Sequence, residues 1–345
     1  MDERQIPATA AVRFASGRAA DRRVAGVAVA ARIVRELAEA GFATAWLAVP
    51  AGEAIDAAAM RDVRRLAGAM DVRIGEPPAD AQVVVVSPDR ADSVDLTNPH
   101  AGREILRRTG KATDGPVSRW LNRPISRAIS ALVLRIPGFA PIHATLGTVV
   151  LALAMFASFV AGGEAGLIAG GLLFHAASVF DGVDGEVARA TFRTSRLGAT
   201  LDALVDAGTN ALLIIGVTIN LWSAGHERAL VLGTWGMVLF FIGQTIIGRR
   251  AARTGAAVDF DLLKRHYRAR LPGRAGALVM EFLTVVSSRD FFAVLFAVLI
   301  VIGVPMAVLY IFAAAATVWI WFVAGLLLPP SDTARIPDGV ESWRP

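Results

Sequence analysis

The sequence predicts an α-helical polytopic membrane protein with six transmembrane helices and an interfacial juxtamembrane helix, preceded by a small N-terminal α/β domain. Its 345 residues are 54% hydrophobic with a mean hydropathy of +0.52, which is high for a soluble globular protein. The apolar residues are concentrated after about residue 137, and Lys and Arg gather in alternate links between the apolar stretches. We therefore expect four segments: a cytoplasmic α/β domain at 1–105, an amphipathic juxtamembrane segment at 106–136, the six-helix domain at 137–330 and a C-terminal tail at 331–345.

The N-terminal domain shows the patterns of a small α/β unit. Val24–Ala40 has an apolar stripe at helical spacing with charged residues elsewhere, and Gly41 stands where a C-terminal cap belongs. Thr44–Val49 and Val83–Val86 are short apolar runs bounded by Pro and Asp, as buried strands are. The first thirty residues carry charges without an apolar core segment, so we expect no cleavable signal peptide. The chain has no cysteine, which excludes disulfides, a thiol nucleophile and cysteine metal ligands.

Six stretches have the length and apolarity of transmembrane helices, since about 20 apolar residues cross the hydrocarbon core. They lie near 138–162, 165–188, 197–223, 229–248, 284–304 and 306–329. The links at 111–136, 189–196 and 249–274 are rich in Lys and Arg, whereas the opposite links are nearly bare. This asymmetry predicts that both termini and the 189–196 link face the cytoplasm. The pI of about 10.5 then follows from topology and from attraction to anionic lipid headgroups or phosphates, so it does not require nucleic acid.

Four carboxylates stand inside this hydrophobic sequence, where ionisable groups are costly and indicate a functional site. Asp181 and Asp184 are separated by three positions, and Asp202 and Asp206 by four. Each pair therefore shares one face of its own helix. Two such faces turned toward each other would form a metal site.

The carboxylates belong to a longer pattern with eight defined positions, Asp181-x2-Asp184-Gly185-x2-Ala188-Arg189-x8-Gly198-x3-Asp202-x3-Asp206. This pattern resembles the signature of the CDP-alcohol phosphotransferase family of integral membrane enzymes, and the resemblance covers roughly residues 111–329. It implies transfer of a phosphate-linked alcohol from a CDP conjugate to a second alcohol, with release of CMP. Such chemistry needs hard divalent cations, Mg²⁺ or Mn²⁺, which prefer oxygen ligands.

The resemblance also implies roles for individual residues. Asp181, Asp184 and Asp202 would bind metal, and Asp206 would contribute to a second ion and act as general base on the incoming hydroxyl. The small residues and the motif arginine would line the CDP site: Gly185, Ala188, Arg189 and Gly198. Family members commonly form homodimers through their membrane helices, and we expect the same here.

Two further segments resemble parts of this family. The run from Lys111 to Ser126 is similar to the juxtamembrane segment of the di-myo-inositol-phosphate-phosphate synthase branch, in which a nucleotidyltransferase-type domain precedes the membrane enzyme; a basic interfacial anchor is the alternative. In most members the first span opens with Pro-Asn-x-x-Thr, whereas here Ile142 replaces Asn. Thr145 is kept and is a candidate CDP contact, and His143 is expected to be an interfacial residue.

The N-terminal domain is similar to a nucleotidyltransferase only in its helix. Those enzymes hold triphosphate with a glycine-rich loop, an Arg and a Lys, whereas Ser16-Gly17-Arg18 offers one glycine and the first Lys of the chain is Lys111. We therefore expect a degenerate, non-catalytic domain. A bifunctional protein with retained nucleotidyl transfer is the alternative.

The acceptor alcohol is left open by the sequence. Arg193 and Arg196 follow the motif and are candidates for binding a phosphorylated polar acceptor, although the positive-inside rule alone also places arginines there. The predicted function is thus metal-dependent CDP-alcohol phosphotransfer. A degenerate non-catalytic member is the alternative, and an ion transporter would need charges deeper in several spans than this chain has.

Overall fold

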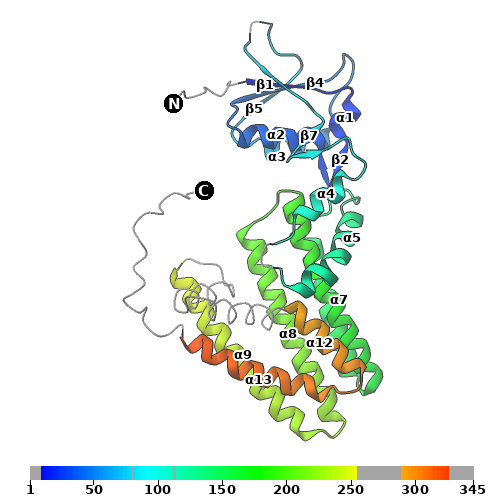
Figure 1. Cartoon of the computed structure of the whole chain (residues 1–345), viewed down its shortest axis with the longest axis vertical. Helices are drawn as coiled ribbons and strands as arrows, with labels where there is room; N and C mark the ends of the chain where they lie inside the picture. The colour runs from blue at the N-terminus through cyan, green and yellow to red at the C-terminus, as the bar shows by residue number, and fades with distance from the viewer. Residues whose placement is uncertain (1–8, 80, 112–113, 255–288, 326–345) are drawn as a thin grey trace. The chain divides into compact units, whose positions relative to one another are not determined.

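The computed structural model describes residues 9–79, 81–111, 114–254 and 289–325, which form two compact units (Figure 1). Unit 1 comprises Met1–Asp114, Arg123–Ala144 and Gly182–Ser195, and unit 2 comprises Gly115–Asn122, Thr145–Asp181 and Arg196–Pro345. Helix α7 (Gly163–Ala190) contributes residues to both units. The last turns of α7 therefore belong to the same compact unit as the N-terminal α/β region.

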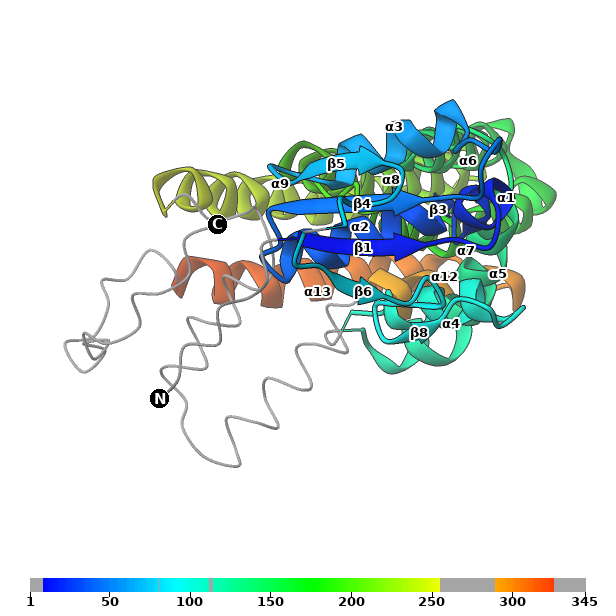
Figure 2. The ribbon, with the colours of Figure 1, turned by 90° about the horizontal axis from the view of Figure 1, so that it is seen from above.

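The N-terminal region is a four-stranded parallel sheet in the order β5-β4-β1-β6, with two short hairpins beside it. Its elements are β1 (Thr9–Arg13), α1 (Gly17–Asp21), β2 (Arg23–Val24), β3 (Val27–Ala28), α2 (Val29–Glu39), β4 (Thr44–Ala48), α3 (Ala57–Leu66), β5 (Asp71–Ile74), β6 (Val84–Val86), β7 (Arg90–Ala91), β8 (Val94–Asp95) and α4 (Ala101–Arg108). Helices α2 and α3 cover one face of the sheet (Figures 1 and 2). The small α/β region is therefore as expected, and β4 and β6 lie where strands were predicted.

The predicted helix at Val24–Ala40 is wrong in its first five residues. Residues 23–28 form the antiparallel hairpin β2–β3, whose turn places Ala25 at φ 45° and Gly26 at φ 79°. Two consecutive positive φ values suit a two-residue hairpin turn and are incompatible with a helix. Helix α2 therefore begins at Val29, and Gly41 at φ 88° follows its end, as predicted.

Among the described residues, four helices are long and apolar enough to cross a membrane: α6 (Pro141–Ala161), α7, α8 (Arg196–Ser223) and α9 (Glu227–Thr254). They match the first four predicted spans. The last two are represented by α12 (Arg289–Val301) and α13 (Met306–Gly325), whose apolar stretches are shorter. Residues 284–288 and 326–329 of these spans, and the predicted tail at 331–345, lie outside the described residues. Four strongly apolar helices are thus shown, and the count of six stays a prediction.

The described part of the juxtamembrane segment is helical over most of its second half. Two elements follow one another there: η1, a π-helical turn (Ser118–Asn122), and α5 (Arg123–Val133). The Trp120 side chain, expected at the headgroup level, is 79% exposed.

The packing of α6, α7 and α8 depends on one buried ring. Phe159 of α6 is fully buried, and a methyl group at Gly170 of α7 or Gly216 of α8 would lie 2.4 Å or 2.8 Å from its ring atoms. A residue larger than glycine at either position would therefore push its helix away from Phe159. One turn further along α8, the buried Asn220 side chain donates to the carbonyl oxygens of Phe159 (2.8 Å) and Gly163 (3.3 Å). These contacts fix the neighbouring helices that carry the motif.

Candidate active site

Three of the four predicted carboxylates come together within unit 2. Asp181 lies on α7, and Asp202 and Asp206 lie one turn apart on α8. One carboxylate oxygen of each lies within 4.8 Å of those of the other two, and all three residues are half-buried. We call these residues the carboxylate triad.

Asp184 lies one turn further along α7 and is only 8% exposed. Among the described residues, the carboxylates that come together are those of the triad, and Asp184 is not one of them. Its predicted role as a metal ligand stays a prediction.

The triad suits a hard divalent cation. Three carboxylates at this separation repel one another, and a cation between them would offset the repulsion. Their oxygens are the ligands that Mg²⁺ and Mn²⁺ prefer, and partial burial leaves room for water or phosphate oxygens to complete the coordination. When bound, such ions would polarise phosphoryl oxygens and stabilise a leaving phosphate.

The predicted nucleotide-binding positions are distributed over three helices. Gly185 and Ala188 are half-buried on α7, Gly198 is exposed in the first turn of α8, and Thr145 is half-buried in the first turn of α6. A methyl group at Gly185 would lie 3.1 Å from the guanidinium nitrogens of Arg189. The absence of a side chain at Gly185 therefore leaves the helix surface beside this guanidinium open.

The Arg189 guanidinium uses one of its nitrogen atoms in a hydrogen bond and has another that could donate to a ligand. Its Nε donates to the carbonyl oxygen of Thr109 at 2.6 Å. Its Nη2 is buried, and within the described part of the chain it donates no hydrogen bond. A buried donor without an acceptor is costly, and a phosphate oxygen would satisfy it.

Comparison with known proteins identifies the segment that holds the site. Residues 139–329 match the model of a family described as CDP-alcohol phosphatidyltransferase. The chain belongs to this family. The match includes every position of the motif, so the triad lies in the part of the chain that defines the CDP-alcohol phosphatidyltransferases.

Three curated relatives carry the name "Bifunctional IPC transferase and DIPP synthase". The protein from Thermococcus kodakarensis is 34% identical over 158 residues, covering 44% of this chain and 35% of the relative. The Aquifex aeolicus protein is 33% identical over 133 residues (39% and 29%), and the Rubrobacter xylanophilus protein is 36% identical over 129 residues (37% and 28%). The similarity thus spans about a third of the length of these relatives. It agrees with the branch that the juxtamembrane segment resembles.

One motif helix residue that sequence reasoning missed is Glu186. It is fully buried and occupies a variable position of the family motif. Its Oε1 accepts from Ser126 at 2.7 Å and from Arg123 at 3.1 Å, and its Oε2 accepts from Ser130 at 2.7 Å. We call these four residues the Glu186 network. Two features of the sequence could have indicated this network. Glu186 is a fifth carboxylate in an apolar helix, and Ser126 and Ser130 stand four positions apart in a basic one.

The Glu186 network continues to Asp114. The Arg123 guanidinium donates to both Asp114 oxygens, at 2.8 and 2.9 Å. Burial alone would lower the pKa of Arg123, but its bonds to Asp114 and Glu186 raise the pKa above its ordinary value. Burial likewise opposes ionisation of Asp114, but the hydrogen bonds and charge of Arg123 hold the pKa of Asp114 below its usual value. The pair is therefore fully charged at neutral pH.

A second polar cluster lies within unit 2. Asp290, in the first turn of α12, accepts from Asn122 at 2.8 Å and from Ser178 at 3.0 Å. Ser178 lies one turn before Asp181 on α7. These bonds connect α12 and η1 to the helix that carries the first motif carboxylate.

Ser16-Gly17-Arg18, which stands where nucleotidyltransferases have a glycine-rich loop, is closed by contacts within the chain. The Gly17 N–H donates to Glu53 at 2.5 Å, and the Ser16 hydroxyl accepts from the Ala19 N–H at 3.1 Å. A methyl group at Gly17 would lie 2.4 Å from the Ala54 carbonyl oxygen. A carboxylate thus takes the backbone donor that a phosphate would use.

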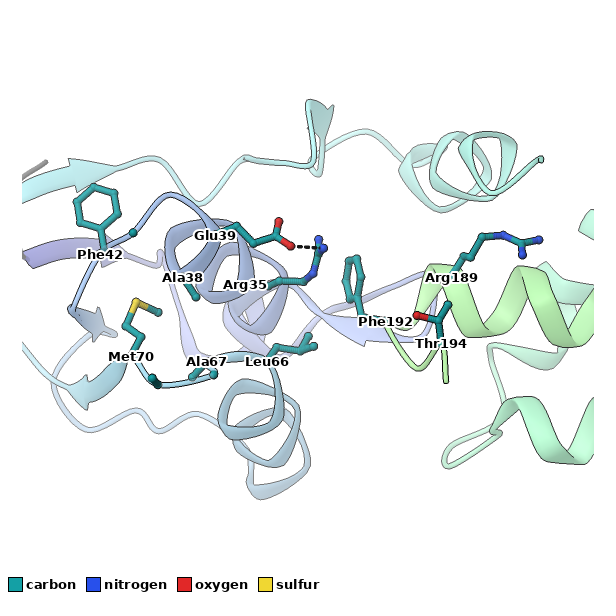
Figure 3. A pocket seen from close by; sticks show the side chains of 13 residues that line it. Arg35, Ala38, Glu39, Phe42, Leu66, Ala67, Met70, Arg189, Phe192 and Thr194 are labelled. Atoms are coloured by element: carbon teal, nitrogen blue, oxygen red, sulfur yellow. Dashed lines mark hydrogen bonds and ion pairs between the residues drawn. The ribbon is translucent and has the colours of Figure 1, made fainter. Parts of the chain in front are cut away.

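A pocket of about 780 Å³ opens within unit 1 between the ends of α2 and α3 and the turn that follows α7 (Figure 3). Arg35 bonds to Glu39 inside it and lies over the Phe192 ring, at 3.9 Å from the ring centroid. Arg189 and Thr194 also line it, but no member of the triad does. The predicted acceptor residues Arg193 and Arg196 are exposed.

Proposed function

We propose that this protein catalyses divalent-metal-dependent transfer of a substituted phosphate group from a CDP-alcohol to an acceptor alcohol, with release of CMP. The observation that carries this proposal is the convergence of Asp181, Asp202 and Asp206 within the segment that matches the family. Asp181, Asp184 and Asp202 would hold the ions, and Asp206 would contribute to the second ion. Bound Mg²⁺ or Mn²⁺ would stabilise charge on the phosphoryl oxygens and on the leaving CMP.

The residues of the chain supply binding and proton transfer. The acceptor hydroxyl oxygen attacks the β-phosphorus, the bond from this phosphorus to the bridging oxygen breaks, and that oxygen leaves with CMP. Asp206 accepts the hydroxyl proton. Gly185, Ala188 and Gly198 give the nucleotide room, and the available Nη2 of Arg189 donates to its phosphate.

The donor and acceptor are proposed to be of inositol-phosphate type. The names of the relatives and the resemblance of the juxtamembrane segment support this choice. Arg193 and Arg196 are the proposed acceptor ligands, and Thr145 a further nucleotide contact. We also propose that the site faces the cytoplasm and that the protein forms a homodimer in the membrane.

The test is CMP release by the purified full chain with Mg²⁺ or Mn²⁺. CDP-inositol and CDP-diacylglycerol are offered separately against a panel of alcohols that includes inositol phosphate. Asp202→Asn should lower turnover by at least about a hundredfold and weaken Mn²⁺ binding, because it removes a charged ligand. The matched control is Asp71→Asn, which makes the same change at an exposed residue paired with Arg73.

The outcomes separate the alternatives. Wild-type CMP release in Asp202→Asn would refute the site assignment. Metal binding that needs Asp202, without CMP release from any donor and acceptor pair, would instead support a degenerate member of the family.

A further inference from the structure

The fully buried side chain with the largest volume in the described part of the chain is Arg32 of α2, which is 1% exposed. A buried guanidinium is costly unless its donors are satisfied. Burial lowers the pKa of Arg32 to about 10, so the group still carries its charge at neutral pH. Its position therefore requires an explanation from its partners.

The partners of Arg32 connect two distant parts of the chain. Its Nε donates to the Val24 carbonyl oxygen at 3.0 Å, and its Nη2 donates to those of Ala25 at 3.2 Å and Ala190 at 2.7 Å. Ala190 is the last residue of α7 and lies 158 positions from Arg32. Carbonyl oxygens at a helix C-terminus lack partners within the helix and attract positive charge. Arg32 thus caps the motif helix from the N-terminal domain.

Two more arginines of this domain contact the turn after α7. The Arg35 guanidinium lies 3.9 Å from the centroid of the Phe192 ring, and Arg32 lies 5.1 Å from it on the same ring. Arg65 donates to the Phe192 carbonyl oxygen at 3.3 Å. We call Arg32, Arg35 and Arg65 the arginine cluster. Ala190 is part of the hydrophobic core of the N-terminal domain, and Phe192 packs against this core.

The turn after α7 holds Phe192 in an unfavourable backbone conformation, which its ring contacts stabilise. Helix α7 ends with Arg193 N–H donating to the Ala188 carbonyl oxygen (2.8 Å) and Phe192 N–H donating to that of Arg189 (3.3 Å). This pattern places Phe192 at φ 56°, a left-handed position where glycine is the usual residue. A phenylalanine there costs about 1 kcal/mol. Contact between its ring and two guanidinium groups offsets this cost.

The turn lies between groups that the proposed reaction uses. Arg189, the proposed nucleotide ligand, is one turn before Arg193, a proposed acceptor ligand. Burial and the positive charge of Arg193 lower the pKa of Arg65. Arg189 lies in the last turn of α7 and Arg193 in the turn that follows, so the conformation of the helix end bears on both.

We propose that the N-terminal domain is a positioning module for the phosphotransferase, and that its arginine cluster sets the end of α7, which carries Arg189, and the following turn, which carries Arg193. Arg32 is a positioning residue and not a catalytic one. This role explains why the domain keeps a packed core while Glu53 accepts from the Gly17 N–H. The kinetic part of the proposal rests on the proposed function, and its structural part does not.

The first readout is hydrogen exchange of the full chain in detergent, measured without substrate. Arg32→Met removes the donors to Ala190 and should raise amide exchange at residues 191–195 about tenfold. Arg32→Lys, which keeps the charge with fewer donors, should give an intermediate rise. The control is Arg13→Met, because Arg13 bonds to Glu76 on the exposed surface of the same domain. It should leave the turn unchanged.

The second readout is kinetic. The KM for the CDP-alcohol should rise about tenfold in Arg32→Met, with kcat reduced less, because displaced binding groups weaken substrate positioning. Direct CDP binding should weaken by the same factor. This measurement remains informative if the acceptor has not been found.

If Arg32→Met disturbs the whole N-terminal domain, Phe192→Ala is the variant that tests the proposal. It removes the ring beneath the arginines, and Phe192 only packs against the core of the domain without being one of its buried residues. Raised exchange in the turn and weaker CDP binding, with unchanged exchange in β1 and β4, would support the proposal. Turn exchange and CDP affinity within twofold of wild type would overturn it, whatever reaction the protein catalyses.

Discussion

Replacing Glu186 by Gln tests whether the Glu186 network holds the motif helix. The substitution keeps the shape of the side chain and removes its charge. Oε1 of the amide can still accept from Ser126 and Arg123, but the NH2 group now faces the Ser130 hydroxyl, which donates in the wild type at 2.7 Å. Arg123 would keep Asp114 as its only carboxylate partner in this network.

The expected loss follows from the number and burial of these bonds. Hydrogen bonds to a charged group contribute about 1.5–3 kcal/mol each, and removing one partner of a buried ion pair costs about 3–5 kcal/mol. Since Gln keeps these contacts only in neutral form, with the Ser130 hydroxyl turned to accept, and removes the charge that pairs with Arg123, we expect a loss of about 2–4 kcal/mol. For a unit of this size that corresponds to a fall in Tm of about 5–15 °C.

Thermal unfolding of the full chain in detergent, followed by tryptophan fluorescence, measures the shift. Ser126→Ala and Ser130→Ala should each cost less, about 1 kcal/mol, because each removes a single donor. The matched control is Glu76→Gln, which makes the same change in an exposed pair with Arg13 and should leave Tm unchanged.

A Tm of Glu186→Gln within about 1 °C of wild type would contradict this expectation. A buried carboxylate that accepts three hydrogen bonds should not be replaced with so small a loss of stability. An equal shift of Tm in Glu76→Gln would contradict the expectation too, because the effect would then come from net charge and not from the buried network.

Three further results are expected. Asp206→Asn should abolish CMP release while retaining more CDP and Mn²⁺ affinity than Asp202→Asn; equal loss of binding in both would contradict a general base at Asp206. Asn220→Leu should lower Tm, because it removes the donor to the Phe159 and Gly163 carbonyl oxygens from a buried site, and a Tm equal to wild type would show that these bonds are not needed. Because the folded-state pKa of Asp114 is lowered, its stabilising effect is complete above its unfolded pKa and is lost as pH falls through the folded value. The Tm difference between wild type and Asp114→Asn should therefore be constant from about pH 8 to 5 and narrow below about pH 4; a difference that persists at lower pH would contradict this assignment.

The features predicted from the sequence are those that local spacing determines. Helical periodicity places Asp202 and Asp206 on one face of α8, and apolar length identifies the first four candidate spans. Both depend on residues within one helix, which a sequence shows directly. The family motif indicated that α7 and α8 should meet, and in the structure Asp181 lies beside Asp202 and Asp206.

Features that depend on distant partners were missed. β1 (Thr9–Arg13) has little strand character of its own and becomes a strand because β4 and β6 pair with it on both sides. The hairpin at 23–28 has a helical apolar pattern, yet the Ala25-Gly26 turn excludes a helix. The partners of Glu186 lie 56 to 63 residues away. No local pattern indicates such pairings.

The variable positions of the family motif have a physical role in this chain. Asp181, Gly185 and Ala188 follow one another at helical spacing, and the variable positions Gly182 and Glu186 repeat the first step of that spacing one residue later. A shift of one residue turns a side chain by about 100° around the helix, so the second set forms a separate face. A methyl group at Gly182 would lie 3.2 Å from Arg123 and 3.3 Å from Ser126, which shows that this face packs against α5. On this face, Glu186 accepts from Ser126 and Ser130 and so joins the motif helix to α5.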